Sequence, residues 1–209
     1  MYIAIEGVKG TGKSTLIDAL LTNLEQSELD FQMYGPTRPM PEHMACEQLA
    51  KNTVLKDKQR AELYMHRANY HAEYIDFSKE LVLGDRSILT SFVTRFPKCD
   101  TQIHTYLASI RQQQPCVPLP DLVIYLQAPI DVIQSRLGNR QRDYGKHDET
   151  IERIVEAQHS YEWLFSRKEQ AGLHNMSVHY IDATQPQFLL RDYVLKLIKK
   201  ELENRIVFQ

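Results

Sequence analysis

The sequence predicts an α/β fold, in which a mostly parallel β-sheet is covered by helices on both faces. Short apolar runs of strand length alternate with segments of helical spacing along the whole chain. The first strand and the first helix are joined by a glycine-rich octet, residues 7–14, with the sequence GVKGTGKS. The chain has 209 residues and no stretch that reads as a linker or an internal repeat. We therefore expect one domain over residues 1–209.

Strands are expected where short apolar runs are bounded by turn residues such as glycine and proline. We place them at residues 1–6, 31–34, 81–83, 122–126 and 178–181. Helices are expected where apolar residues recur every three or four positions. We place them at residues 15–26, 57–79, 87–94, 101–113, 131–137, 150–170 and 188–203.

Composition excludes several classes of protein. The net charge of −2 gives no electrostatic case for binding nucleic acid or an acidic membrane surface. Cys46, Cys99 and Cys116 are scattered without a C-x-x-C pair, which favours the reducing cytoplasm over disulfides or a zinc site. The apolar runs are too short to span a membrane, and the first strand begins so early that we expect no signal peptide.

The octet matches G-x-x-x-x-G-K-[ST], the phosphate-binding loop. Its glycines let backbone N–H groups turn inward on a polyphosphate, and the following helix adds a favourable dipole. Lys13 would reach the β- and γ-phosphates of ATP, and the Ser14 hydroxyl would bind Mg²⁺. The alternative is a glycine turn that merely caps a helix, but the flanking strand and helix favour phosphate binding. The predicted ATP-binding residues are Gly7, Val8, Lys9, Gly10, Thr11, Gly12, Lys13, Ser14 and Thr15.

Other motifs narrow the class of phosphate-loop protein. The N-K-x-D and D-x-x-G motifs of GTPase switches are absent, as is the S-G-G signature of ABC-type ATPases. Asp85 follows a short strand and is followed at once by Arg86. At the end of a strand, Asp85 would hold Mg²⁺ through water, and Arg86 would face the phosphoryl group being transferred. The alternative is that Asp85 caps the helix beginning near Ser87 and Arg86 is a surface charge.

The segments EGVKGTGKST (residues 6–15) and DRSILTS (residues 85–91) resemble the thymidylate kinase and deoxynucleoside kinase superfamily. PDLVIYL (residues 120–126), the R-x-x-x-R-x-R pattern of residues 136–142 and IDAT (residues 181–184) agree with it. The resemblance implies a five-stranded parallel sheet of order 2-3-1-4-5. It also implies ATP with Mg²⁺ as donor, a mobile lid at about residues 136–148, and a homodimer.

The lid would carry Arg136, Arg140 and Arg142, whose guanidinium groups would close on the β- and γ-phosphates. With Lys13 and Arg86 they are the predicted catalytic residues; the alternative for the lid arginines is a solvated basic helix end. In the family's second subtype, glycine follows the acidic residue of the phosphate loop and the catalytic arginine lies in the lid, which fits Gly10. Lys9 departs from the family, which usually has an acidic residue there, and this leaves open how the acceptor sugar is held.

The acceptor site is predicted from the segment GPTRP, residues 35–39, which is similar to the F-P-E-R segment of eukaryotic thymidylate kinases. Arg38 matches the arginine that grips the acceptor phosphate, whereas Thr37 replaces the glutamate. A monophosphate is already mostly ionised at neutral pH and needs cations, whereas a nucleoside hydroxyl needs a carboxylate to take its proton. Arg38 therefore favours a nucleotide acceptor, and the nearby Glu42 keeps a nucleoside acceptor open.

The helix AELYMHRAN, residues 61–69, resembles the family's base-binding helix, and Arg67 and Asn69 match its arginine and polar partner. Leu63 stands where phenylalanine is usual, Tyr64 is the nearest aromatic residue, and Thr94-Arg95 replaces a Tyr-Gln pair. The alternative is an amphipathic core helix with exposed Arg67 and Asn69. The predicted acceptor-binding residues are Arg38, Leu63, Tyr64, Arg67, Asn69 and Arg95.

These motifs predict a cytoplasmic kinase that moves the γ-phosphate of ATP to a (deoxy)nucleoside monophosphate, most similar to a dTMP kinase. A deoxynucleoside kinase that phosphorylates a 5′-hydroxyl is the alternative enzyme. A non-catalytic nucleotide-binding or ATPase regulator is the alternative from another class, supported only by the altered acceptor positions Lys9, Thr37, Leu63 and Arg95.

Overall fold

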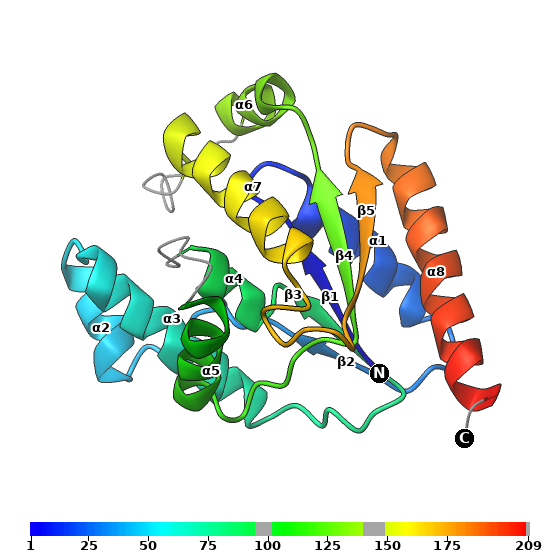
Figure 1. Ribbon diagram of the computed structural model, residues 1–209, viewed down its shortest axis with the longest axis horizontal. Coiled ribbons are helices and arrows are strands. Elements are labelled where there is room, and N and C mark those ends of the chain that lie inside the picture. The colour runs from blue at the N-terminus through cyan, green and yellow to red at the C-terminus, as the bar shows by residue number, and fades with distance from the viewer. Residues whose placement is uncertain (95–101, 140–148, 208–209) are drawn as a thin grey trace.

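The computed structural model describes residues 1–94, 102–139 and 149–207. Five parallel strands form one sheet in the order β2-β3-β1-β4-β5 (Figure 1), which confirms the predicted fold class and strand order. The strands are β1 (Tyr2–Glu6), β2 (Phe31–Tyr34), β3 (Leu81–Asp85), β4 (Leu122–Gln127) and β5 (Ser177–Asp182).

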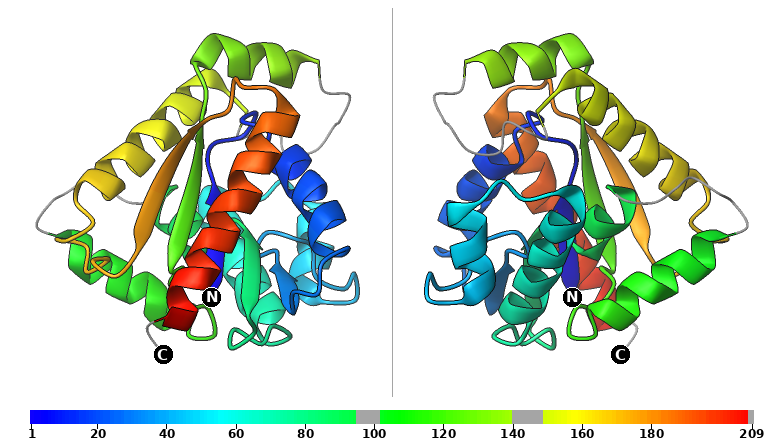
Figure 2. Two further views of the ribbon diagram at one scale, coloured as in Figure 1. Left: turned by 90° about the vertical axis from the view of Figure 1, so that its right-hand side faces the viewer. Right: turned by 90° about the vertical axis from the view of Figure 1, so that its left-hand side faces the viewer.

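Helices cover both faces of the sheet (Figures 1 and 2). They are α1 (Lys13–Leu24), α2 (Ala45–Asn52), α3 (Asp57–Ala72), α4 (Ile88–Val93), α5 (Ile103–Gln113), α6 (Ile130–Gly138), α7 (Ile151–Ser166) and α8 (Gln187–Val207). Helices α1 and α8 pack together on one face, and α4 lies on the other, in contact with α3, α5 and α7. No helix in the described part of the chain combines the length and the apolar character needed to cross a bilayer.

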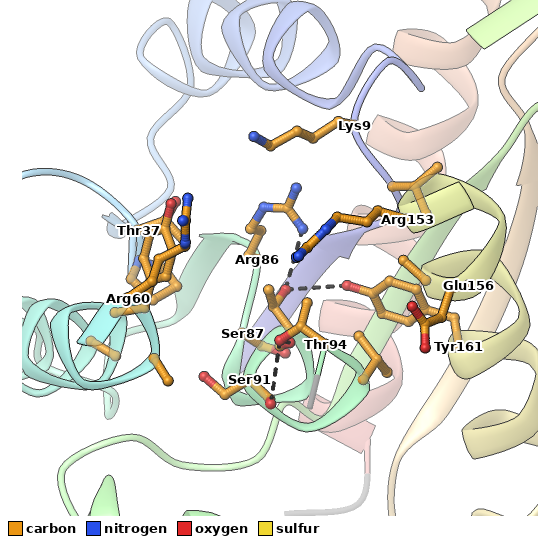
Figure 3. Close-up of a pocket in the computed structure, with 18 of the residues that line it drawn as sticks. Lys9, Thr37, Arg60, Arg86, Ser87, Ser91, Thr94, Arg153, Glu156 and Tyr161 are labelled. Carbon is orange, nitrogen blue, oxygen red and sulfur yellow. Dashed lines mark hydrogen bonds between the residues drawn. The ribbon is translucent and has the colours of Figure 1, made fainter. Parts of the chain in front are cut away.

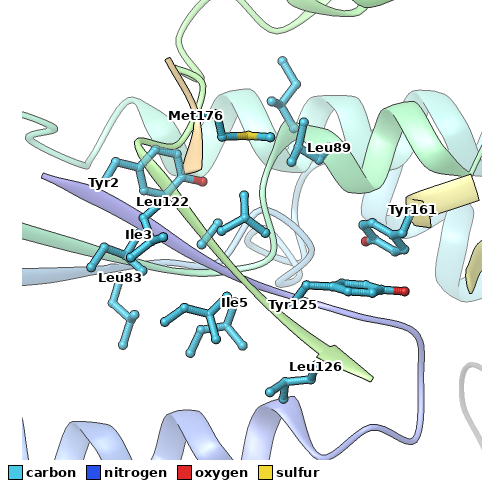
Figure 4. Packing of buried hydrophobic residues seen from close by; sticks show 14 of the residues in the cluster. Tyr2, Ile3, Ile5, Leu83, Leu89, Leu122, Tyr125, Leu126, Tyr161 and Met176 are labelled. Carbon is cyan, nitrogen blue, oxygen red and sulfur yellow. The ribbon is translucent and has the colours of Figure 1, made fainter. Parts of the chain in front are cut away.

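The central strands are buried because both of their faces are covered. All five residues of β1 and the first five of β4 are buried, as expected for parallel strands between two helix layers. Tyr125 of β4 packs against Tyr161 of α7, with ring centroids 5.0 Å apart, in the cluster shown in Figure 4. The sheet order changes direction at β1, whose neighbours are β3 and β4. Ligands of such sheets bind at the carboxyl ends of the strands near this point.

Helix α3 is shorter than the sequence predicted. It ends at Ala72 rather than continuing to residue 79. The Asp76 carboxylate accepts hydrogen bonds from the backbone N–H and the hydroxyl of Ser78, which makes a tight turn. That turn places Phe77 against Tyr2 and Tyr34, at ring distances of 5.2 and 5.5 Å. Packing of the Phe77 ring against this cluster therefore competes with helix continuation.

Helix α2 was not predicted. The one buried residue of this short helix is the charged Glu47, whereas Leu49 is 45% exposed, so burial in α2 does not follow its apolar residues. The predicted helix over residues 150–170 is also shortened, because α7 ends at Ser166. The predicted lid falls mainly on residues 140–148, which lie outside the described residues, and it stays a prediction.

Candidate active site

The phosphate loop joins β1 to α1, and all three of its glycines have positive φ. Gly7, Gly10 and Gly12 have φ of 141°, 88° and 92°, which L-residues with side chains rarely adopt. Gly10 is restricted a second time, because a Cβ added there would lie 2.8 Å from Ile133 Cγ2 of α6. The glycine pattern of the motif is therefore explained by the backbone path and by the close approach of α6.

The side chain of Lys13 lies against the carbonyl groups of the phosphate loop, whereas the hydroxyl residues that follow it are exposed. Lys13 is 7% exposed, and its Nζ donates hydrogen bonds of 2.8 Å to the carbonyl oxygens of Gly7 and Val8. Ser14 and Thr15 are exposed in the first turn of α1, where free N–H groups and the helix dipole favour an anion. This is the arrangement expected of a polyphosphate site.

Arg86 lies beside the loop in an unusual backbone conformation. It is the one described residue other than glycine with positive φ, at 80°. Its Nη1 donates to the carbonyl of Gly7 at 3.3 Å and to Thr90 Oγ1 at 3.4 Å. Ser87, not Asp85, caps α4, because its hydroxyl accepts from the N–H of Leu89 at 3.1 Å. The geometry thus disfavours the alternative in which Asp85 is the cap and Arg86 a surface charge.

Neighbouring groups keep the guanidinium of Arg86 protonated. Burial lowers the pKa of the Arg86 guanidinium, but Tyr161, Glu6 and Asp85 nearby raise it, and the balance lies above the ordinary value. A permanently cationic, half-buried arginine beside the phosphate loop suits the stabilisation of phosphoryl charge.

Ser14 and Asp85 supply hydroxyl and carboxylate oxygens, the hard donors that Mg²⁺ prefers. Asp85 ends β3 and pairs in register with Ile5, two residues before the phosphate loop. The described residues contain no cluster of three or more His, Cys, Asp or Glu side chains that could hold a metal. Mg²⁺ in such sites is bound mainly by substrate phosphates and one or two protein oxygens, which Ser14 and Asp85 would supply. When bound, Mg²⁺ would neutralise phosphate charge.

A cavity of about 440 Å³ opens beside the phosphate loop, between α3, α4 and α7. Four cationic side chains of the described residues line it, and they approach from different elements (Figure 3): Lys9, Arg60, Arg86 and Arg153. Two carboxylates, Asp57 and Glu156, also line it, and Arg153 Nη2 lies 3.4 Å from Asp57 Oδ2, which links α7 to α3. The remaining lining combines apolar side chains with serine, threonine and tyrosine residues. The cavity therefore suits a ligand with an anionic end and a flat, less polar body.

The structure brings only part of the predicted acceptor site to this cavity. Tyr64 lines it, whereas Leu63 is buried in the helix packing, with 6% exposure. Asn69 Nδ2 donates to the carbonyl of Gln113, the last residue of α5, at 2.8 Å. Arg38 is exposed, and its side chain folds over Gly35, so it is not among the described lining residues. Arg95, Arg140 and Arg142 lie outside the described residues.

Arg136 contacts the phosphate loop and is not among the described residues that line the cavity. Its Nη1 donates to the carbonyl of Thr11 at 3.3 Å, and its Nη2 donates to that of Ala183 at 2.8 Å. It thereby connects the loop with the segment after β5. The predicted catalytic role of Arg136 is not tested by these contacts and stays a prediction.

Arg67 is bound to Glu47 instead of lining the cavity. Its Nε and Nη2 lie 2.6 Å from the two carboxylate oxygens, and its Nη1 donates to the carbonyl of Thr37 at 3.2 Å. Glu47 also accepts the N–H of Met40 at 3.0 Å. The two side chains are 13% and 9% exposed. The alternative of an exposed Arg67 is therefore wrong. The ion pair fixes the loop of residues 35–40 against α2 and α3.

Glu47→Gln should lower the free energy of unfolding by about 3 kcal/mol, because it leaves Arg67 without its counter-charge in a mostly buried site. For a chain of this size that is a fall in Tm of roughly 6–12 °C, measurable by calorimetry. Glu42→Gln is the matched control, since the Glu42–Lys51 ion pair is exposed and its loss should leave Tm unchanged.

The same pair predicts a pH dependence of stability. Burial raises the pKa of Glu47, but hydrogen bonds from Arg67 and Met40 and the charge of Arg67 hold it below its ordinary value of 4.5. A carboxyl whose pKa is lowered by folding stabilises the protein above its unfolded pKa, and this contribution is lost as the pH falls through the folded pKa. The stability curves of the parent and Glu47→Gln should therefore converge below about pH 4.5.

Glu6 is the site residue that sequence reasoning missed most clearly. It is fully buried at the end of β1, and its carboxylate accepts four hydrogen bonds, from Ser87 N and Oγ, Thr90 Oγ1 and Tyr161 OH. The signal in the sequence was a single carboxylate at the end of an apolar strand, directly before the phosphate loop. Arg60 and Arg153 were also missed, since nothing in their local sequence shows that α3 and α7 face one cavity.

Comparisons with known proteins agree with this geometry. The thymidylate kinase family model matches residues 5–192. The chain is 27% identical over 176 residues to the thymidylate kinase of Helicobacter pylori (strain Shi470), covering 82% of this chain and 86% of that protein. It is 25% identical over 205 residues to a probable thymidylate kinase 1 of Saccharolobus solfataricus, covering 96% and 97%.

A solved structure of a deoxyadenosine kinase from M. mycoides with bound dATP has the same fold, with a TM-score of 0.65 and 20% identity. The alignment covers 95% of this chain and all of that one. At this identity the likeness concerns the fold alone. The family model, in contrast, covers most of the chain, including the phosphate loop, the Asp85-Arg86 pair and the walls of the cavity. The chain therefore belongs to the thymidylate kinase family.

Proposed function

We propose that this protein transfers the γ-phosphate of ATP to a (deoxy)nucleoside monophosphate, with dTMP as the acceptor. The observation that carries the proposal is the cavity that begins at the phosphate loop and is lined by four cationic side chains of the described residues. The match to the thymidylate kinase family supports dTMP over other monophosphates.

In this proposal the N–H groups of the phosphate loop and Lys13 bind the β- and γ-phosphates of ATP. Arg86 touches the loop at Gly7 and also lines the cavity, so it lies where donor and acceptor phosphates meet. Ser14 and Asp85 would hold Mg²⁺. The cytoplasmic location, the homodimer and the lack of a nucleic-acid or membrane partner stay predictions. Light scattering after gel filtration tests the homodimer.

The deoxynucleoside kinase alternative needs a carboxylate near the acceptor hydroxyl. Glu42 was the candidate, but its side chain is 85% exposed and pairs with Lys51 at 3.2 Å. It is not among the described residues that line the cavity. The position of Glu42 therefore favours a monophosphate acceptor, which does not need a base.

The test is a panel of acceptors incubated with ATP and Mg²⁺: dTMP, dUMP, dCMP, dAMP, dGMP and thymidine. Ion-exchange chromatography separates ADP and each phosphorylated product. We expect dTDP and ADP in equal amounts from dTMP. Formation of dTMP from thymidine would support the nucleoside kinase, and ADP without any phosphorylated acceptor would support an ATPase or regulator.

Arg38→Ala should lower kcat/KM for dTMP by about 30-fold or more and leave KM for ATP nearly unchanged. Loss of one charge-assisted partner of a phosphate costs roughly 2–5 kcal/mol. The proposal requires the exposed Arg38 side chain to rotate away from Gly35 when the acceptor binds. Steady-state kinetics with each substrate varied in turn gives both constants.

Two variants serve as comparisons for Arg38→Ala. Arg60 already lines the cavity, so a large loss in Arg60→Ala together with a neutral Arg38→Ala would assign the phosphate contact to α3. Glu42→Gln should be nearly silent with dTMP. A neutral Arg38→Ala combined with an inactive Glu42→Gln would instead make the nucleoside kinase the better assignment.

A further inference from the structure

The carboxylate of Glu6 has no role in the mechanism proposed so far, although it lies directly before the phosphate loop. It is fully buried, and a buried carboxylate is costly unless several donors compensate for the lost water. Four donors do so: Ser87 N at 2.8 Å, Ser87 Oγ at 2.7 Å, Thr90 Oγ1 at 2.9 Å and Tyr161 OH at 2.6 Å. They come from the start of α4 and from α7.

The hydrogen-bond directions in this cluster are determined by Glu6. The carboxylate oxygens of Glu6 act as acceptors here, so the hydroxyl of Thr90 directs its proton toward Glu6. The lone pairs of the Thr90 hydroxyl are then available to Arg86, whose Nη1 lies 3.4 Å away. Arg86 Nη1 also donates to the carbonyl of Gly7, the residue that follows Glu6. Glu6 thus acts on the guanidinium of Arg86 through one intervening hydroxyl.

Glu6 also acts on the backbone of Arg86. The N–H of Ser87, the next residue, donates to Glu6 Oε1, and the Ser87 hydroxyl is bound to the same oxygen. Arg86 has φ of 80°, and a left-handed conformation costs an ordinary residue about 1–2 kcal/mol. Such a conformation persists only when neighbouring contacts hold it. The bond from Ser87 to Glu6 is one of those contacts.

We infer that Glu6 is a positioning residue for Arg86. Through Thr90 and through the backbone of Ser87, Glu6 orients the Arg86 guanidinium toward the phosphoryl group being transferred. The inference rests on the proposed function, in which Arg86 contacts that group. Tyr161 belongs to the same cluster, so α7, which carries the cavity residue Arg153, is joined to the phosphate loop by the same carboxylate.

Glu6→Gln tests the inference because it keeps the shape of the side chain and replaces one acceptor oxygen by an N–H₂ donor. The Thr90 hydroxyl would no longer be held as an acceptor for Arg86. Since a misplacement of about 1 Å at a reacting centre costs up to about 10²-fold, we expect kcat to fall tenfold or more. KM for ATP should change by less than about twofold, because Arg86 acts mainly in the transition state.

Thr90→Val and Thr90→Ser test the intervening hydroxyl. Thr90→Val removes it with little change of shape and should lower kcat as Glu6→Gln does, whereas Thr90→Ser should recover most of the loss. The double variant Glu6→Gln/Thr90→Val should lose little more than the stronger single variant, because both interrupt one path. Asp121→Asn is the structural control. Asp121 accepts from Tyr2 N at 2.7 Å at the opposite end of β1, so its loss should lower Tm but not kcat.

Arginine NMR gives a readout that does not depend on turnover. In protein labelled with ¹⁵N-arginine, Arg86→Lys identifies the Arg86 side-chain resonance, and Glu6→Gln and Thr90→Val should both shift it. Asp121→Asn should not. Failure of the parent protein to phosphorylate any acceptor would overturn the proposed function, while the NMR result would still decide the position of Arg86.

Three results would overturn the inference itself. One is an unmoved Arg86 resonance in Glu6→Gln. Another is a Glu6→Gln protein that loses stability but keeps the parent kcat, which would make Glu6 purely structural. The third is parent-like kcat in Thr90→Val, a result that remains decisive even where Glu6→Gln does not fold.

Discussion

Lys13→Ala should lower kcat for phosphoryl transfer by about 10²-fold or more while the fold remains intact. The Lys13 ammonium lies inside the phosphate loop, 2.8 Å from the carbonyl oxygens of Gly7 and Val8, so it is already held where the β- and γ-phosphates would bind. Phosphoryl transfer depends almost entirely on such positioned charge. Initial rates of dTDP formation under saturating substrates measure the effect.

The control for Lys13→Ala is Lys196→Ala, on the exposed face of α8, which should keep the parent rate. Circular dichroism and Tm establish that both variants are folded. Turnover of a folded Lys13→Ala protein within about threefold of the parent would refute the donor-site assignment, since the loss of a positioned cation is expected to cost several kcal/mol in the transition state.

The fold was predictable because its signals are local. Each central strand is a short apolar run next to a turn residue. The phosphate loop is a contiguous octet whose backbone requires glycine at the positions with positive φ. The strand order 2-3-1-4-5 could not be predicted from local signals. It came from the family resemblance, since alternating strands and helices alone do not fix which strands are neighbours.

The site was less predictable because its contacts are long-range. The bond between Glu6 and Tyr161 joins residues 155 positions apart, and Arg67 binds a carboxylate on α2, 20 positions earlier in the chain. The resemblance therefore placed Arg67 correctly on α3 but could not show that Glu47 binds it. Lys9 shows the same limit. Its cavity position is evident only in three dimensions, and it puts a cation where the family usually has an acid.

Arg86→Ala should cause the largest loss, about 10³-fold in kcat, because an arginine that stabilises the transferring phosphoryl group contributes 10³–10⁵-fold in related chemistry. Arg86 lies beside the loop carbonyl of Gly7 and lines the cavity, so it is placed to contact both phosphates. The measurement is kcat with dTMP and ATP saturating. Arg86→Lys should recover part of the loss, because it restores a charge but not the forked guanidinium.

The backbone of Arg86 supplies a sharper comparison. At φ of 80°, alanine is as strained as arginine, whereas glycine adopts this conformation without cost. Arg86→Gly should therefore be about 1 kcal/mol more stable to denaturant than Arg86→Ala, yet equally inactive. Equal stability would mean that the left-handed conformation relaxes once the side chain is removed. Activity near that of the parent in either variant would show that the cation at this position does not take part in phosphoryl transfer.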